Sequence, residues 1–424
     1  MKKLPLSPLL LLPLFINAQV SYSGSLQPVT MNRTSDYSAI TLPFRIAELD
    51  VGFTNGNFDF KTNSVIEYRW SGEDTQFDLR EAYLVWYPSW GELKIGKQIH
   101  AWGAVDGNNP TDNLNPYDYY FMFLPGTERK IGTLSGSLKY YWNDWQLEAV
   151  VIPEHIPNRY PFGEEDFPIT TEDPSDFIQK AKKGKEYGIR LQTTLGNSDI
   201  SASFFSGRDR GFSLEGYEIA NVPSLEWYPA ILPGFSYRKT TVAGIDFVTF
   251  VGDFTLRGEG AYFQTKNDYS CDFKNELEAS YIQYAFQMEY LTPFDLLVTG
   301  QLIGNHVSSV KGKIYEQSFE MFSARDATEE DFQGGMGTPF AMFTDLGMFL
   351  STSVNFWDNT LEIRLNTFLD LDESQSMFGG GFTYSLIDNW EIDCSATQLT
   401  GAKGTIFHEI KDFSHLTFGI KYSF

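Results

Sequence analysis

Alternation of apolar and polar side chains with a period of two is the feature that most constrains the fold of this chain. In the last segment, Leu416, Phe418, Ile420, Tyr422 and Phe424 alternate with polar or small residues. Successive side chains of a β-strand point to opposite faces, so this pattern predicts a strand with one apolar and one polar face. Similar segments of about ten residues recur along the chain, which predicts an almost entirely β structure.

The alternating segments predict eighteen strands. Their expected ranges are 19–28, 43–53, 57–70, 76–87, 91–102, 129–142, 145–153, 185–196, 198–207, 234–251, 253–266, 278–291, 294–306, 341–356, 359–371, 376–387, 390–399 and 413–424. Sixteen strands stays open as an alternative, because the alternation slips in the first two segments.

The connections between these segments alternate in length. Every second connection is short and rich in turn-forming residues: Asn55-Gly56, Ser89-Trp90-Gly91, Asn143-Asp144, Gly196-Asn197, Gly252, Thr292-Pro293, Asp358 and Asp388-Asn389. The intervening connections are usually longer, notably 103–128, 154–184, 208–233, 267–277 and 307–340. Tight periplasmic turns, longer outer loops and an even strand number are typical of transmembrane barrels. Aromatic residues beside the tight turns fit an interfacial girdle: Trp90, Trp142, Trp145, Phe294, Trp357 and Trp390.

These patterns predict an all-β, transmembrane antiparallel up-and-down barrel with long outer loops. A secreted β-sandwich or a propeller also uses short alternating strands. A sandwich rarely strings together so many long strands, however, and the repeat of about forty residues that a propeller would show is absent. Residues 1–18 resemble a cleaved export signal, with Lys2 and Lys3 before an apolar stretch. We therefore expect a single barrel domain, 19–424, in the outer membrane of a Gram-negative-type envelope.

Charge and composition restrict the partners. The formal net charge is −23, so nucleic acid is excluded as a partner, since binding it requires a basic surface. Two cysteines, Cys271 and Cys394, cannot form a disulfide framework, and we expect neither a metal nor another cofactor. The five histidines lie in no catalytic motif, which predicts that the protein is not an enzyme. The expected partners are outer-membrane lipid, lipopolysaccharide and small polar solutes, and a homo-oligomer stays open.

The polar faces of the clearest strands give an inventory of expected pore-lining residues. The basic ones are Arg80, Lys94, Arg190, Arg257, Arg364 and Lys421, and the acidic ones are Asp78, Glu259, Glu289, Glu362, Glu391 and Asp393. A barrel of about sixteen to eighteen strands is too wide for side chains to fill, so a water-filled path is expected unless loops plug it. Any single charge could instead pair across neighbouring strands and stiffen the wall.

Residues 79–102 carry the most distinctive motifs. Arg80-Glu81-Ala82-Tyr83 precedes a tight turn, and Gly96-Lys97-Gln98 precedes Trp102-Gly103. Together with Asn115-Pro116-Tyr117-Asp118 and Pro125-Gly126, this segment resembles outer-membrane porins of the alginate-export and related uncharacterised porin-like families. The resemblance implies a porin-like barrel and no particular substrate. Lys97 stands where those families usually have arginine, and the acidic net charge fits poorly with export of a polyanion.

The loop 103–128 is the third outer loop, and the resemblance implies that it folds into the barrel. Its acids, Asp106, Asp112, Asp118 and Glu128, are expected to form a constriction. Acids facing Arg80, Lys94 and Arg190 would set a transverse field that selects polar solutes. The alternative is a lid on the surface.

Strict alternation along this segment would point the Lys97 side chain toward lipid. A lysine that faces lipid at bilayer depth destabilises a barrel by roughly 2–4 kcal/mol. A bulge near Gly96 is therefore expected to return Lys97 to the lumen.

The leading functional hypothesis is an outer-membrane porin-like channel for passive or weakly selective diffusion of small polar solutes. The alternative is a substrate-specific channel for a hydrophobic or oligosaccharide ligand, because aromatic residues gather in 117–123 and 212–236. A third class is a non-conducting barrel that acts as an adhesin or structural anchor.

Overall fold

The structure is a computed structural model that describes residues 19–72, 75–167, 174–178, 184–220, 230–269, 271–318, 321–342 and 344–424. The predicted export signal, 1–18, lies outside the described residues.

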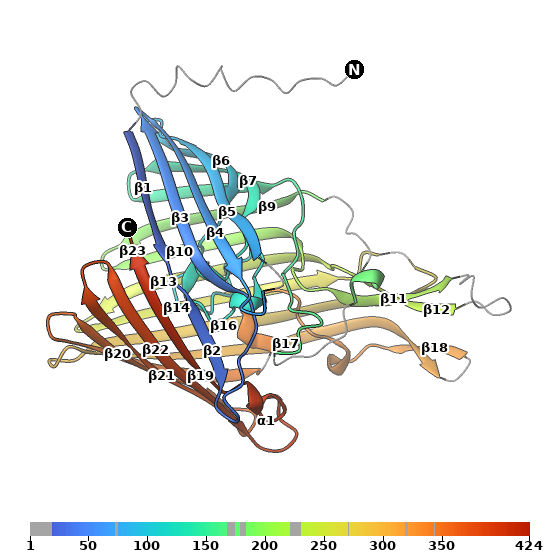
Figure 1. The fold of residues 1–424 in the computed structure, drawn as a ribbon. Coiled ribbons are helices and arrows are strands. Elements are labelled where there is room, and N and C mark those ends of the chain that lie inside the picture. Colours follow the sequence, from blue (N-terminus) through green and yellow to red (C-terminus); the bar gives the residue numbers. More distant parts are fainter. Residues whose placement is uncertain are drawn as a thin grey trace, which may run out of the picture.

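The described residues form antiparallel strands with a few short helices between them (Figure 1). The strands are β1 (Gln19–Leu26), β2 (Val29–Arg33), β3 (Phe44–Asn55), β4 (Phe58–Tyr68), β5 (Thr75–Trp86), β6 (Gly91–Gln98), β7 (Thr133–Trp142), β8 (Trp145–Ile152), β9 (Glu186–Leu195), β10 (Ser198–Arg208), β11 (Ser213–Ala220), β12 (Ala230–Ser236), β13 (Lys239–Val251), β14 (Phe254–Lys266), β15 (Phe273–Lys274), β16 (Glu276–Leu291), β17 (Leu296–Ser318), β18 (Met321–Asp326), β19 (Leu346–Phe356), β20 (Leu361–Asp370), β21 (Gln375–Ile387), β22 (Trp390–Gly401) and β23 (His415–Ser423). The helices are α1 (Ile406–Glu409) and six 3-10 turns: Tyr119–Phe121, Gly126–Arg129, Ser175–Phe177, Glu329–Asp331, Pro339–Met342 and Lys411–Phe413.

Pairing between the first and last strands closes the sheet into a barrel. β1 pairs with β3 along its whole length, and β1 and then β2 pair with β23. Gln27 and Pro28 interrupt this first strand because proline has no backbone N–H to donate to the ladder. The described sheet has 20 strands, of which β2 continues β1 and β18 only extends β17, so the closed barrel has 18 strands. The predicted fold class and strand number are confirmed.

Each predicted segment corresponds to one barrel strand, and the main differences lie beyond the barrel. β17 was expected to end at residue 306 but continues to Ser318, where it pairs with β18. Beyond residue 306 this strand has no continuous lipid-facing apolar row, so its sequence lacks the pattern of a membrane-spanning strand. β11 and β12, which pair with each other, and the short β15 were also not anticipated.

The short connections gather at one end of the barrel, which we call the turn end, and the long ones at the opposite loop end. Gly56, Gly196 and Gly252 have φ values near +60°, and Asn143 and Asn389 have φ values of +51° and +70°. These are conformations that glycine and asparagine adopt most readily, which explains the turn residues seen in the sequence. The first barrel strand begins at the turn end, and the last one finishes there. Gln19 pairs with Thr54, and the backbone N–H of Ser423 donates to the carbonyl of Asn389.

The outer face of the barrel is apolar. In β16, Ile282, Tyr284, Phe286 and Met288 are exposed, whereas the alternate residue Gln287 is buried on the inner face. At the turn end, several predicted girdle residues are also exposed: Trp90, Trp145, Phe294, Trp357 and Trp390. Among the described residues, the helices are too short or too polar to cross a membrane.

Candidate functional site

The connection between β6 and β7 runs through the interior of the barrel, and we call residues 99–132 the inward loop. Glu259 on β14 anchors it, because its carboxylate is buried and accepts hydrogen bonds from the loop. The backbone N–H of Val105, the Asn109 amide and the Thr111 hydroxyl each donate to this carboxylate at 2.8 Å. The backbone N–H of Ala104 also donates to it.

The inward loop reaches the far side of the barrel. The backbone N–H of Asp106 donates to Gln287 on β16 at 2.9 Å, and the Asn108 amide donates to Gln301 on β17 at 2.7 Å. In the described sheet, seven barrel strands separate β6 from β17 along the wall. In a closed barrel of eighteen strands this distance is close to half the circumference, so the loop divides the lumen.

Close packing against the wall accompanies this path. Gly188 on β9 faces the loop, and a Cβ atom there would lie 2.7 Å from Leu114 and 2.8 Å from Trp102. The indole N–H of Trp102 donates to Glu148 on β8 at 3.1 Å. The loop is therefore fitted to the barrel wall by both shape and hydrogen bonds.

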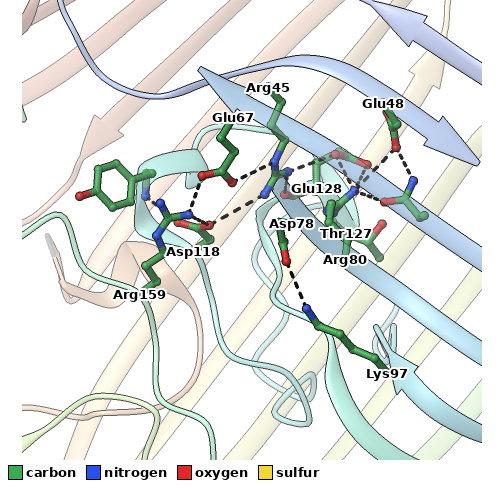
Figure 2. Close-up of polar contacts among 12 residues, drawn as sticks. Arg45, Glu48, Glu67, Asp78, Arg80, Lys97, Asp118, Thr127, Glu128 and Arg159 are labelled. Atoms are coloured by element: carbon green, nitrogen blue, oxygen red, sulfur yellow. Dashed lines mark hydrogen bonds and ion pairs between the residues drawn. The ribbon is translucent and has the colours of Figure 1, made fainter. Parts of the chain in front are cut away.

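Where the inward loop returns toward β7, its acids join a network of arginines (Figure 2). Glu128 pairs with Arg80 of β5 at 3.0 Å and with Arg45 of β3 at 3.3 Å. Asp118 pairs with Arg159, from the connection after β8, at 3.0 Å. Two outer connections and three neighbouring strands therefore share one chain of alternating charges.

Asp118 is a deeply buried acid of this network, with 3% of its surface exposed. Burial raises the pKa of its carboxyl group to about 6, and Arg159 only partly offsets this effect. Glu67 on β4 adds to the rise because it is a second carboxylate beside the same arginine. This carboxyl group therefore changes charge under mildly acidic conditions.

The four acids predicted to form a constriction have different environments. Glu128 and Asp118 belong to the arginine network. Asp112 is buried and pairs with Lys130 of the same loop. The side chain of Asp106 is 71% exposed, 3.5 Å from Arg257 of β14.

Only one of the three basic residues predicted to face these acids pairs with one of them. Arg80 does pair with Glu128 of the loop. Lys94 pairs instead with Glu92 at 3.0 Å, and Arg190 pairs with Asp246 at 2.8 Å. Lys94 and Arg190 thus pair with residues of the wall itself.

The other predicted pore-lining residues fall into two settings. The covered wall consists of inward side chains of β14, β16 and β17 beneath the inward loop. It holds the predicted residues Arg257, Glu259 and Glu289, together with Gln287 and Gln301, which are outside the predicted set. Glu259, Gln287 and Gln301 are almost completely buried. Arg257 pairs with Glu289 at 2.8 Å.

The uncovered wall consists of inward side chains of β20, β22 and β23: Glu362, Arg364, Glu391, Asp393 and Lys421. Arg364 pairs with Glu362 at 2.9 Å and with Asp393 at 2.8 Å, and these three side chains are 31–43% exposed. Glu391 and Lys421 lie opposite each other in the register of β22 and β23. Among the described residues, the hydrogen-bond partners of Arg364 all belong to the wall.

Lys97 contacts Asp78 of β5, at 3.2 Å. The prediction of a bulge near Gly96 is wrong in its position, because the register of β6 is continuous against both neighbours. The irregularity lies in β5, where Leu79 and Glu81 face consecutive residues of β4 and Arg80 is the extra residue. Gly96 instead has a φ of +141°, a backbone conformation that residues other than glycine rarely adopt.

Among the described residues, no three His, Cys, Asp or Glu side chains gather as a metal site. Cys271 and Cys394 are both free thiols. The absence of catalytic activity stays a prediction.

A cavity of about 570 Å³ at the loop end was not predicted. We call it the loop-end cavity. The inward loop, residues 158–167, the start and end of the β10–β13 connection, and residues 333–338 line it. Gly337 has φ +108°, and a Cβ there would collide with the Gln283 amide, so the glycine-rich sequence 334–337 was a signal of close packing.

Comparisons with known proteins reveal similarity of fold only. No protein-family model matches the sequence, and no curated protein matches it. Among solved structures, OccK2 (OpdF) of Pseudomonas aeruginosa has a TM-score of 0.53 at 10% identity, covering 96% of this chain and 97% of that one. OccK2 in complex with glucuronate gives 0.51 at 11% identity, with the same coverage. OccK11 (OpdR) of the same organism gives 0.51 at 10% identity and 95% coverage of both chains. These structural neighbours are outer-membrane β-barrels.

Proposed function

We propose that the protein is an outer-membrane porin-like channel for passive or weakly selective diffusion of small polar solutes. The observation that carries the proposal is the uncovered wall. Arg364, Glu362 and Asp393 lie on the inner face of a closed barrel and yet are 31–43% exposed, so water reaches them. The path proposed for solutes runs between the inward loop and β20–β23.

In this proposal the inward loop is the constriction. It occupies the lumen beside β14–β17, where it buries Glu259 and Gln287. The side chains of Asp106 and Glu128 are 71% and 39% exposed and face the remaining space, where Asp106 pairs with Arg257 and Glu128 pairs with the buried Arg80. Opposite charges across a narrow passage orient water and favour polar solutes over apolar ones.

The membrane setting belongs to the same proposal. The apolar outer face would contact lipid, and the loop end would face lipopolysaccharide, with the mature chain 19–424 exported by the segment 1–18. The motifs at Arg80–Tyr83 and Gly96–Gln98 support kinship with the alginate-export and uncharacterised porin-like families.

The alternative, a substrate-specific channel for a hydrophobic or oligosaccharide ligand, is favoured by the loop-end cavity. Aromatic rings predicted from 117–123 and 212–236 do line it, including Tyr119, Phe212 and Phe235. A weakly selective pore has no need of a cavity with this lining.

Single-channel recording in planar bilayers tests the channel proposal. The variant replaces residues 108–122 with a flexible Gly/Ser linker, which removes the part of the loop that follows its contact with Gln287 on the far side of the lumen. We expect a severalfold rise in conductance, because the lumen widens where Asn108 and Thr111 are lost. Heat-modifiable gel mobility serves as the control that the variant barrel is folded. Unchanged conductance of a folded variant would contradict the constriction, and a silent, folded native barrel would favour the adhesin or structural-anchor class.

A further inference from the structure

The loop-end cavity contains buried polar groups without partners. The Tyr117 and Thr338 hydroxyl oxygens and the Asp112 and Asn113 Oδ1 atoms have no hydrogen-bond partner among the described residues. Each of these four residues is at most 5% exposed, and each lines the cavity. An unpaired buried polar group costs about 1–3 kcal/mol, so a ligand that pairs with these groups would bind favourably.

The chemistry of the four groups defines the ligand they would accept. A carboxylate or amide oxygen can only accept a hydrogen bond, so Asp112 and Asn113 require donors from the ligand. The hydroxyl groups of Tyr117 and Thr338 can donate or accept. A ligand with several hydroxyl groups meets all four requirements at once.

The charges at the cavity are already compensated. Three arginines line it, and so do three acids: Asp112, Glu316 and Asp331. Arg210 pairs with Glu186 at 2.7 Å, and Arg325 pairs with both Glu316 and Asp331 at 2.6 Å.

Arg238, the third arginine, is also occupied. It donates to Asn267 and to the Gln333 carbonyl, and its guanidinium lies 4.9 Å from the Phe332 ring centre. The positive charge of Arg238 interacts with the nearby carboxylates of Asp209 and Glu215. Each of the three arginines at this cavity therefore has acidic neighbours in the protein, and an anionic ligand would bring an uncompensated charge.

One side of the cavity is aromatic. Tyr160 stacks on Tyr119 with ring centres 4.7 Å apart and contacts Phe162 and Phe212 at 5.4 Å and 5.9 Å. Phe212 continues the cluster to Phe235 at 5.7 Å. Flat apolar rings beside hydrogen-bonding groups suit a sugar ring, which has C–H groups on its faces and hydroxyl groups at its rim. The volume of about 570 Å³ falls within the range of about 300–1,000 Å³ for small-molecule sites.

We propose that the loop-end cavity is a binding site for a neutral, hydroxyl-rich carbohydrate of one or two sugar units. Asp112, Asn113, Tyr117 and Thr338 bind its hydroxyl groups, and the Tyr160–Phe212 cluster packs against its rings. This inference deepens the proposed channel function, because it rests on that function for the route by which the sugar reaches the lumen.

Isothermal titration calorimetry tests the site without requiring conduction. The refolded mature protein is titrated with glucose, maltose and glucuronate in a detergent without a sugar headgroup. We expect maltose or glucose to bind and glucuronate to bind at least tenfold more weakly. The proposal would be overturned if neither glucose nor maltose gave a measurable heat of binding. It would also be overturned if glucuronate bound as tightly as the neutral sugars.

Tyr117→Phe and Thr338→Val remove only hydroxyl groups that have no protein partner, so neither change weakens the fold. Each is expected to weaken sugar binding about threefold to tenfold, as one lost hydrogen bond would. Thr193→Val is the matched control, because the Thr193 hydroxyl is buried and unpaired but lies outside the cavity. An unchanged affinity for the neutral sugars in both cavity variants would overturn the proposal. The partners of these hydroxyl groups would then be bound water molecules.

Planar-bilayer recordings separate this inference from the channel function. Conductance without sugar binding would overturn the site and leave the channel standing. Sugar binding without conductance would support the site and overturn the channel.

Discussion

The covered and uncovered walls of the barrel have the same kind of sequence and different surroundings. Both alternate outward apolar with inward polar residues, as in Phe286-Gln287 of β16 and Ile363-Arg364 of β20. Gln287 is completely buried by the inward loop, whereas the side chain of Arg364 is 43% exposed. A strand sequence thus specifies which side chains face inward, while a distant loop decides which of them meet water. Substitutions should accordingly affect stability on one wall and selectivity on the other.

The largest effect on stability is expected from Glu259→Leu on the covered wall. The substitution leaves the N–H groups of Ala104 and Val105 and the hydroxyl of Thr111 without their acceptor inside the barrel. Each unpaired buried donor costs about 1–3 kcal/mol, so the free energy of unfolding should fall by at least about 3 kcal/mol. Urea denaturation in detergent micelles measures it. A loss below about 1 kcal/mol would contradict the anchoring role of Glu259.

Protonation of Asp118 should give a smaller effect with a defined sign. The folded-state pKa of about 6 lies above the ordinary aspartate pKa of 3.8, so the folded barrel binds more protons than the unfolded chain between these values. This group's contribution to the free energy of unfolding therefore rises by about 2–3 kcal/mol as pH falls from 6 toward 4.

Urea titrations of the native protein and of Asp118→Asn at several pH values test this dependence. The variant should lose that part of the pH dependence, and Asp106→Asn, at a mostly exposed carboxylate, is the matched control. Identical pH profiles for the native protein and Asp118→Asn would refute the assignment.

Gly188→Ala should cost about 1–3 kcal/mol because the new methyl group would press on Leu114 and Trp102 of the inward loop. Gly260→Ala is the matched control, since a Cβ there meets nothing within 4 Å. Denaturation midpoints of the two variants measure the difference. Equal midpoints would mean that the loop is not packed tightly against β9.

Arg364→Gln on the uncovered wall should change the free energy of unfolding least, by no more than about 1 kcal/mol, as for exposed ion pairs. It removes the positive charge between Glu362 and Asp393, so the pore should become more cation-selective. The reversal potential in a salt gradient measures this change. An unaltered reversal potential, with conduction intact, would place the solute path elsewhere.

The barrel was predictable from the sequence because its signals are local. Alternation depends on next-nearest neighbours along the strand, and turns such as Asn143-Asp144 depend on residues that tolerate positive φ. The first strand was recognised as weak, and the break at Gln27 and Pro28 explains why. The extension of β17 was missed because, outside the membrane, a strand needs no continuous apolar face.

The environment of the candidate site was less predictable because its contacts are distant in sequence. Thr111 and Glu259 are 148 residues apart, and no local pattern relates them. Strict alternation correctly indicated an irregularity near Lys97, but residue types alone placed it at Gly96 rather than in β5. The aromatic residues of 117–123 were visible in the sequence, whereas nothing in the sequence indicated that Thr338 lines the same cavity as Tyr117.

The separation of Thr111 from Glu259 also has a consequence for assembly. Contacts between distant residues form slowly because a long stretch of chain must first be ordered. The inward loop can dock only after β14, β16 and β17 stand in register, so we expect it to settle late during folding. A closed but still undocked barrel would then precede the native state, and it would be the most permeable form of the protein during its biogenesis.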